Sequence, residues 1–160
     1  MKIQEIPGWL NQPPVAGPGS LLLLRLMVGG VFFWEGIIKF VFFNQGTGRF
    51  AKLGIPFPEI MGPTIGTFEI VGGLFLMAGL LTRWTTILFV MEMIVAILST
   101  KISLFLGTYP LAPPPAPPVF GFWAVLHEIR SDYAQIMVSL FLFINGSGPL
   151  SLDAILRRKR

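Results

Sequence analysis

Long apolar segments with few charges limit how this chain can fold. A helix needs about 20 mainly apolar residues to cross the hydrocarbon core of a bilayer, where it satisfies its own backbone hydrogen bonds. The sequence offers four such segments. We therefore predict an all-α integral membrane protein, a four-helix bundle with spans at about 20–43, 63–81, 84–106 and 123–145.

The fourth segment differs from the other three. Its purely apolar part, 133–144, is too short to cross about 30 Å of hydrocarbon at 1.5 Å per residue. We therefore expect this helix to begin near Trp123. Its first half would then carry four polar residues at the membrane rim: His127, Glu128, Arg130 and Asp132.

The overall composition agrees with a membrane environment. Of the 160 residues, 53% are hydrophobic and 12% are charged, and the mean hydropathy is +0.72. Soluble domains carry charge on about 25% of their residues, so the composition argues against a soluble enzyme. The net charge of +4 describes membrane orientation better than nucleic-acid binding, because no basic patch with interleaved aromatics lies outside the span ends.

Residue types that carry metal and redox chemistry are scarce. The chain has no cysteine, which excludes disulfides, thiolate metal sites and iron–sulfur clusters. Its single histidine, His127, excludes bis-histidine haem ligation by this chain alone. We predict no metal site and expect His127 to lie at the membrane interface.

The segments outside the spans suggest surface structures. Residues 1–19 contain four prolines and three glycines, which predicts an interfacial arm with Trp9 at the membrane surface. Residues 107–123 contain six prolines and form either a polyproline II strap or a loop without a partner. Residues 146–160 contain the motif GSGPLSLD, in which Ser151 is expected to cap a short helix, and a basic cytoplasmic tail.

The distribution of basic residues predicts that both termini lie in the cytoplasm, an N-in/C-in orientation. Six bases then lie on the inner side and three on the outer side, and Lys101 near the outer end of its span narrows the margin to six against four. The inner bases are Lys2, Arg83, Arg157, Arg158, Lys159 and Arg160, and the outer ones are Arg49, Lys52 and Arg130.

Charged residues within the spans are few and balanced in sign, which predicts pairing inside the bundle because an isolated charge in hydrocarbon is costly. Glu35 and Lys39 are four residues apart, a spacing that favours a helix ion pair. Lys101 is a further charge at the rim of the third span. The predicted buried polar cluster is Arg25, Glu35, Lys39, Glu69 and Glu92.

Small residues surround one of these carboxyls. Gly62, Gly66 and Gly73 share a helix face with Glu69, which allows another helix to approach closely. On the third span, Thr85, Glu92 and Ser99 form a polar stripe.

Three roles are open for the cluster. It can fix the register of the helices, bind a polar headgroup such as a quinone ring, or transfer protons through its carboxyls. The sequence does not choose among them, although a structural role is the simplest.

Three sequence motifs resemble the DoxX-like family of four-helix bacterial and archaeal membrane proteins. The first span carries Arg25, Gly29, Gly30, Gly36 and Lys39, and the second carries EIVGGLFLMAGLLTR. The C-terminal motif is similar to the family's G-P-G-x-x-S-L-D ending, with Ser147 in place of a proline. Its matching residues are Gly146, Gly148, Pro149, Ser151 and Asp153.

The resemblance implies a multi-pass protein of the bacterial or archaeal cytoplasmic membrane, in a family that includes subunits of quinone-linked oxidoreductases. We therefore expect a subunit of an electron-transfer complex that anchors or assembles it, with a quinone as a possible ligand. This chain is then more simply a non-catalytic subunit than an enzyme by itself. The alternative is a scaffold subunit of a respiratory or photosynthetic complex, in contact with lipids, other subunits or pigments. A small transporter is a weaker alternative.

Overall fold

The computed structural model describes residues 6–112 and 114–158, and this part of the chain contains helices and no strands. The all-α prediction is confirmed. The third predicted span is a composite: an α-helix continues through a π turn, Ile97–Lys101, and a 3-10 turn, Ile102–Leu104. The α-helices are α1 (Ile6–Asn11), α2 (Leu21–Val41), α3 (Thr47–Lys52), α4 (Pro58–Ala78), α5 (Thr82–Ala96), α6 (Phe122–Asn145) and α7 (Leu152–Arg158).

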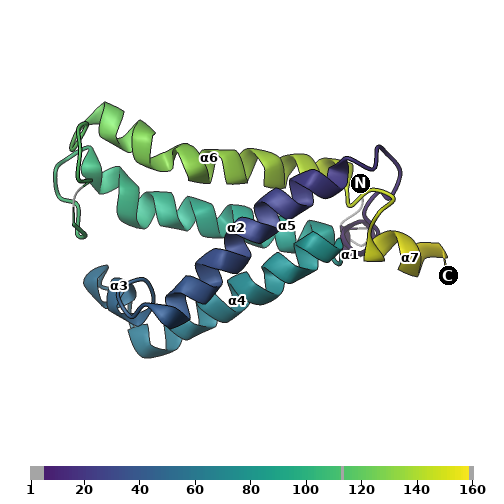
Figure 1. Ribbon diagram of the computed structural model, residues 1–160, viewed down its shortest axis with the longest axis horizontal. Helices are drawn as coiled ribbons and strands as arrows, with labels where there is room; N and C mark the ends of the chain where they lie inside the picture. The colour runs from purple at the N-terminus through teal and green to yellow at the C-terminus, as the bar shows by residue number, and fades with distance from the viewer. Residues whose placement is uncertain (1–5, 113, 159–160) are drawn as a thin grey trace.

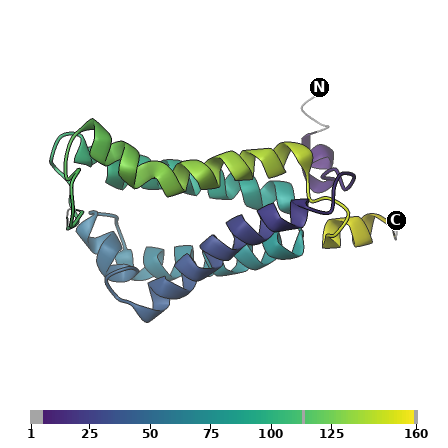
Figure 2. The same ribbon diagram turned by 45° about the horizontal axis from the view of Figure 1, so that its top comes forward.

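The four long helices form two pairs. Helix α2 packs along α4, and α5 packs along α6 (Figure 1). Figure 2 shows the pairs as two layers that lie close at the end carrying both termini and separate toward the end carrying α3. Helices α4 and α5 follow each other directly in an antiparallel hairpin, as expected, but each packs mainly on another partner.

Glycines bring α2 and α4 into close contact. A Cβ atom at Gly36 would lie 2.6 Å from the carbonyl oxygen of Gly66, and one at Gly73 would lie 2.6 Å from that of Gly29. Any larger residue at these positions would push the backbones apart. Gly62 lies against Thr47 at the start of α3, where a Cβ would be 2.9 Å from the Thr47 nitrogen.

An aromatic cluster joins the two pairs. The rings of Phe32 on α2 and Phe89 on α5 are stacked with centroids 3.6 Å apart, and Phe68 on α4 meets Phe89 edge-on at 5.5 Å. Gly72 provides room for this contact, because a Cβ there would lie 2.8 Å from the Phe89 ring. These side chains belong to the core, which continues toward the termini through Val28, Leu76 and Leu142.

The side chains are distributed as in a membrane protein. Many large apolar residues are exposed, including Leu23, Trp34 and Val95, whereas Arg25, Glu69 and Arg83 are buried. Three helical segments among the described residues are long and apolar enough to cross a membrane: Leu21–Val41, Pro58–Ala78 and Thr82–Leu104. Helix α6 has 24 residues but bears charges in its first half, so its crossing stays a prediction.

The observed helix bounds differ from the predicted spans mainly at α4. This helix begins at Pro58 rather than near residue 63, because a proline fits the first turn of a helix and Pro63 is accommodated soon afterwards. The predicted interfacial arm, 1–19, contains the short helix α1. Lys2, Lys159 and Arg160 lie outside the described residues, and the predicted N-in/C-in orientation is untested.

The C-terminal motif binds the turn between α4 and α5. Asp153 accepts hydrogen bonds from the backbone nitrogens of Leu81 (3.0 Å) and Thr82 (3.2 Å) and from the Thr82 hydroxyl (3.0 Å). Leu81 has a positive φ of 49°, an arrangement that costs a non-glycine residue about 1–2 kcal/mol. Asp153 therefore caps α5 and holds a strained turn. Ser151 caps α7 as predicted, accepting a hydrogen bond from the Ala154 nitrogen at 3.1 Å.

Two buried arginines complete this end of the molecule. Arg25 donates a hydrogen bond to the carbonyl oxygen of Leu150. Arg83 donates to the carbonyl oxygens of Phe143 (2.9 Å) and Trp9 (2.7 Å), and its guanidinium lies 3.5 Å from the Trp9 ring centroid. The terminal segments and the helix ends are thus connected through arginine donors and backbone acceptors.

We predict that Asp153→Ala destabilises the protein by about 1–2 kcal/mol, the typical effect of losing a helix cap. Thermal unfolding in detergent measures this change. Asp153→Asn keeps one acceptor oxygen and should lose less, and Leu81→Gly, which removes the positive-φ strain, should recover part of the loss in the Asp153→Ala background. An Asp153→Ala protein that unfolds like the wild type would contradict this role.

Candidate functional site

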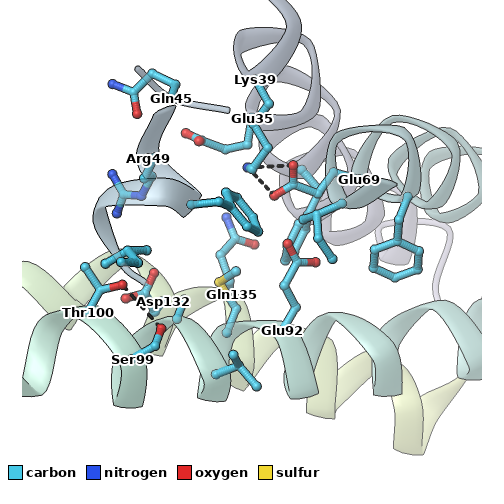
Figure 3. A pocket seen from close by; sticks show the side chains of 18 of the residues that line it. Glu35, Lys39, Gln45, Arg49, Glu69, Glu92, Ser99, Thr100, Asp132 and Gln135 are labelled. Carbon is cyan, nitrogen blue, oxygen red and sulfur yellow. Dashed lines mark hydrogen bonds and ion pairs between the residues drawn. The ribbon is translucent and has the colours of Figure 1, made fainter. Parts of the chain in front are cut away.

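A cavity of about 680 Å³ lies between the two helix pairs. The aromatic cluster borders it on the side of the termini, since Phe32 and Phe68 are among its lining residues. Apolar residues such as Ile65, Leu88 and Met93 form much of its wall. Its polar lining residues are Glu35, Lys39, Gln45, Arg49, Glu69, Glu92, Ser99, Thr100, Lys101, Ser131, Asp132 and Gln135, most of which appear in Figure 3.

An ion pair between α2 and α4 forms one side of the cavity. The Lys39 Nζ lies 2.7 Å from Glu69 Oε1 and 2.6 Å from Oε2, and both side chains are largely buried. The close contact of Gly36 with Gly66 sets the short helix separation that this pair spans. The ammonium faces both carboxylate oxygens, which makes the contact strong and directional.

Glu35 does not take part in this ion pair. The sequence spacing predicted an ion pair between Glu35 and Lys39, but Lys39 reaches across to α4 instead. Glu35 is exposed and lines the cavity beside Lys39 (Figure 3). The cavity therefore has a carboxylate near its surface as well as one in its interior.

Glu92 brings a further carboxyl group into the interior. It rises from α5 toward the Glu69 carboxylate on α4 (Figure 3). Its Oε2 atom is buried and has no hydrogen-bond partner among the described residues. Two facing carboxyls thus share one lysine, so the site needs one more proton, cation or hydrogen-bond donor to balance them.

A second ion pair joins the π turn after α5 to α6. Lys101 in the π turn is paired with Asp132 and donates to the Glu128 carbonyl oxygen at 2.9 Å. Asp132 is buried within the protein, and Gln135 one turn further is buried too. The expected place of Asp132 at the membrane rim stays a prediction. The Gln135 amide oxygen has no partner within the described residues.

Sequence reasoning gave no role at the site to Asp132 and Gln135. A signal was present: Asp132, Gln135 and Ser139 follow a 3 and 4 spacing on α6, and all three are buried. His127 and Arg130 are exposed, in agreement with their expected place near the interface.

Arg25 lies apart from the other members of the predicted cluster. It is fully buried near the termini, bound to Leu150, and does not line the cavity. The structure brings together the other four: Glu35, Lys39, Glu69 and Glu92. Gly66 and Gly73 lie between α2 and α4, and Gly62 lies against α3.

The open end of the cavity carries a positive charge. Arg49 on α3 and Gln45 line it opposite the buried carboxyls (Figure 3).

Tyr109 in the proline-rich segment is influenced by the Arg49 charge. The pKa of the Tyr109 phenol is raised, because burial and the Glu128 charge raise it while Arg49 lowers it. The described residues contain no cluster of three or more histidine or acidic side chains arranged to hold a metal ion.

Known proteins resemble this chain over most of its length. A family model described as DoxX matches residues 20–102. The uncharacterized membrane protein Rv3486 of Mycobacterium tuberculosis is 36% identical over 159 residues, covering 96% of this chain and 91% of that protein. A protein named putative oxidoreductase CatD, from Bacillus subtilis, is 30% identical over 132 residues, with 82% and 83% covered. No solved structure matches.

We predict that Lys39→Met destabilises the protein by about 3–5 kcal/mol, because it leaves the buried Glu69 carboxylate without its counter-charge. Thermal unfolding in detergent measures the effect. The double variant with Glu69→Gln should recover much of the loss, and Lys52→Met, at an exposed lysine on α3, should change little. A single Lys39→Met variant as stable as the wild type would show that the pair is not structural.

Proposed function

The chain belongs to the DoxX family, and on this premise we propose that it is a membrane subunit of a quinone-linked oxidoreductase complex whose cavity binds the quinone headgroup. The observation that carries this proposal is the buried Glu92 Oε2 atom, which has no hydrogen-bond partner within residues 6–112 and 114–158 and lies opposite the Lys39–Glu69 pair in a cavity with a partly apolar wall. Apolar walls with a few converging polar groups are typical of small-molecule sites.

The polar groups of the cavity fit both oxidation states of such a ring. A quinone oxygen accepts hydrogen bonds, and the Gln135 amide and the Thr100 hydroxyl are donors in the lining. A quinol hydroxyl donates, and Glu92 Oε2, which has no partner in the part of the chain that the structure describes, can accept this hydrogen bond. The headgroup would therefore lie between α5 and α6 on one side and the Lys39–Glu69 pair on the other.

Proton exchange gives the carboxyls a role. Interconversion of a quinone and its quinol moves protons as well as electrons, and this chemistry belongs to the ligand. Glu92 would hold or release a proton at Oε2, and the exposed Glu35 would connect the cavity to the aqueous end. Lys39 would hold the Glu69 carboxyl in place through their ion pair.

A partner subunit would supply the electrons. The sequence offers no cysteine for an iron–sulfur cluster, and the Bacillus relative is named an oxidoreductase. The protein would anchor that partner in the cytoplasmic membrane. The alternative, a scaffold subunit of a respiratory or photosynthetic complex, stays a prediction.

We predict that Glu92→Leu weakens the binding of a tail-free quinone, menadione, at least about tenfold, because it removes the acceptor that faces the cavity. Titration of the purified protein in nanodiscs, with oxidised and with reduced menadione, measures the affinity. Glu59→Gln, at an exposed carboxyl on the first turn of α4, is the matched control and should bind like the wild type. Wild-type protein that binds neither form would refute the quinone site.

The subunit role has a separate test. Purification from the native membrane in mild detergent, followed by identification of co-purifying proteins, should recover a partner that carries a flavin, haem or iron–sulfur cluster. Glu69→Gln should reduce recovery of that partner or activity of the complex. A protein that purifies alone, at full yield and without a redox partner, would contradict a subunit role.

A further inference from the structure

The cavity opens sideways as well as toward the end that carries α3. Leu88 and Val95 on α5 line it, yet their side chains are 42% and 61% exposed. A residue that both lines a cavity and is exposed lies where the cavity meets the surroundings. Leu88 and Val95 flank Glu92 on one stripe of α5, so this opening lies beside the unpartnered carboxyl.

The opening faces α4 and is lined mainly by apolar residues. Phe68 on α4 lines the same cavity and meets α5 through Phe89, and Ile65 precedes it by about one turn on the same face. On the side toward the termini, the gap between α4 and α5 is filled where Gly72 meets Phe89. Farther from the termini than this contact, four apolar residues border the gap: Ile65, Phe68, Leu88 and Val95. Glu92 lies between the last two on α5, and the exposed Ser99 follows about one turn after Val95.

A second gap, between α2 and α6, is more polar. Its exposed lining residues are Val31, Glu35 and Ser131. Burial of a hydrocarbon chain against apolar surface is favourable, whereas an exposed carboxylate such as Glu35 favours a polar group beside it. The two gaps therefore suit different parts of a ligand.

The gap between α4 and α5 lies within the predicted hydrocarbon region. Leu88 is the seventh residue of a segment, Thr82–Leu104, that is long enough to cross the membrane, and Val95 is near its middle. Lipid chains, and not water, surround such positions. A ligand that uses this gap is thus in contact with the bilayer interior.

We propose that this gap is the path of a hydrocarbon tail, so that the protein takes lipid-tailed ligands directly from the bilayer. The headgroup would lie inside the cavity beside Glu92, and the tail would leave between α4 and α5, in contact with Leu88, Val95 and Phe68. The inference rests on the proposed quinone site and specifies the class of ligand: a ring with a long isoprenoid or alkyl chain. A water-soluble ring without a tail fills only the polar part of the cavity.

Variants that narrow the gap between α4 and α5 test whether a hydrocarbon tail passes through it. Val95→Trp and Leu88→Trp place a bulky apolar side chain at an exposed position in the opening. Ile94→Trp is the matched control, because Ile94 is also exposed on α5 but does not line the cavity. The ligands are menadione and the same ring carrying a geranylgeranyl tail, titrated into nanodiscs of one lipid composition so that partitioning cancels between variants.

We expect Val95→Trp and Leu88→Trp to weaken binding of the tailed ring by about tenfold or more while menadione affinity changes less than about twofold. Ile94→Trp should bind both ligands like the wild type. Two results would overturn the path: tailed-ring affinity unchanged in both gap variants, or an equal loss for both ligands. If menadione does not bind the wild type at all, the proposed quinone site fails, which is a distinct outcome.

Discussion

The shape of the cavity depends on the ion pair between Lys39 on α2 and Glu69 on α4. In a hydrocarbon environment an unpaired charge is costly, so the two side chains stay paired. Their pairing fixes α2 against α4. The glycines at 29, 36, 66 and 73 bring the two backbones close enough for the pair to form. With α2 and α4 fixed together, α5 and α6 form a separate layer, and the space between the layers is the cavity.

The two ends of the molecule are built differently. At the end with the termini, three charged side chains bind backbone groups of distant segments and so hold the layers together. Arg25 and Arg83 donate to carbonyl oxygens, and Asp153 accepts from a backbone nitrogen. At the other end, the regular helix of α5 gives way to a π turn that carries Lys101 to Asp132. Such turns are frequent at functional sites, and here the turn places Ser99 and Thr100 in the cavity wall.

Hydropathy predicted the helical segments well because membrane spans are defined by length and apolarity. The predicted bounds for α2 and α6 agree with the observed helices within a few residues. Local spacing was a poorer guide to the ion pairs. It joined Glu35 to Lys39, whereas the glycine contact puts Glu69 within reach of the same lysine, and contacts between helices are not encoded by spacing along one helix.

The same reason explains the remaining site residues. Arg25 has the same type of charge as Lys39 but lies on α2 more than three turns away, where the C-terminal motif provides its acceptor. Asp132 was not expected to face the cavity because its ion-pair partner, Lys101, lies on another helical segment. The cavity itself results from the divergence of two helix pairs, which no pattern within a single segment describes.

We propose that the Glu92 carboxyl, whose Oε2 atom is buried, is the group that meets the ligand. Infrared difference spectroscopy in nanodiscs, with and without a tailed quinone, detects a change at a single carboxyl group. We expect a carboxyl band in the difference spectrum that disappears in Glu92→Gln and persists in Glu59→Gln. A difference spectrum without a carboxyl band, from protein that has bound the ligand, would contradict it.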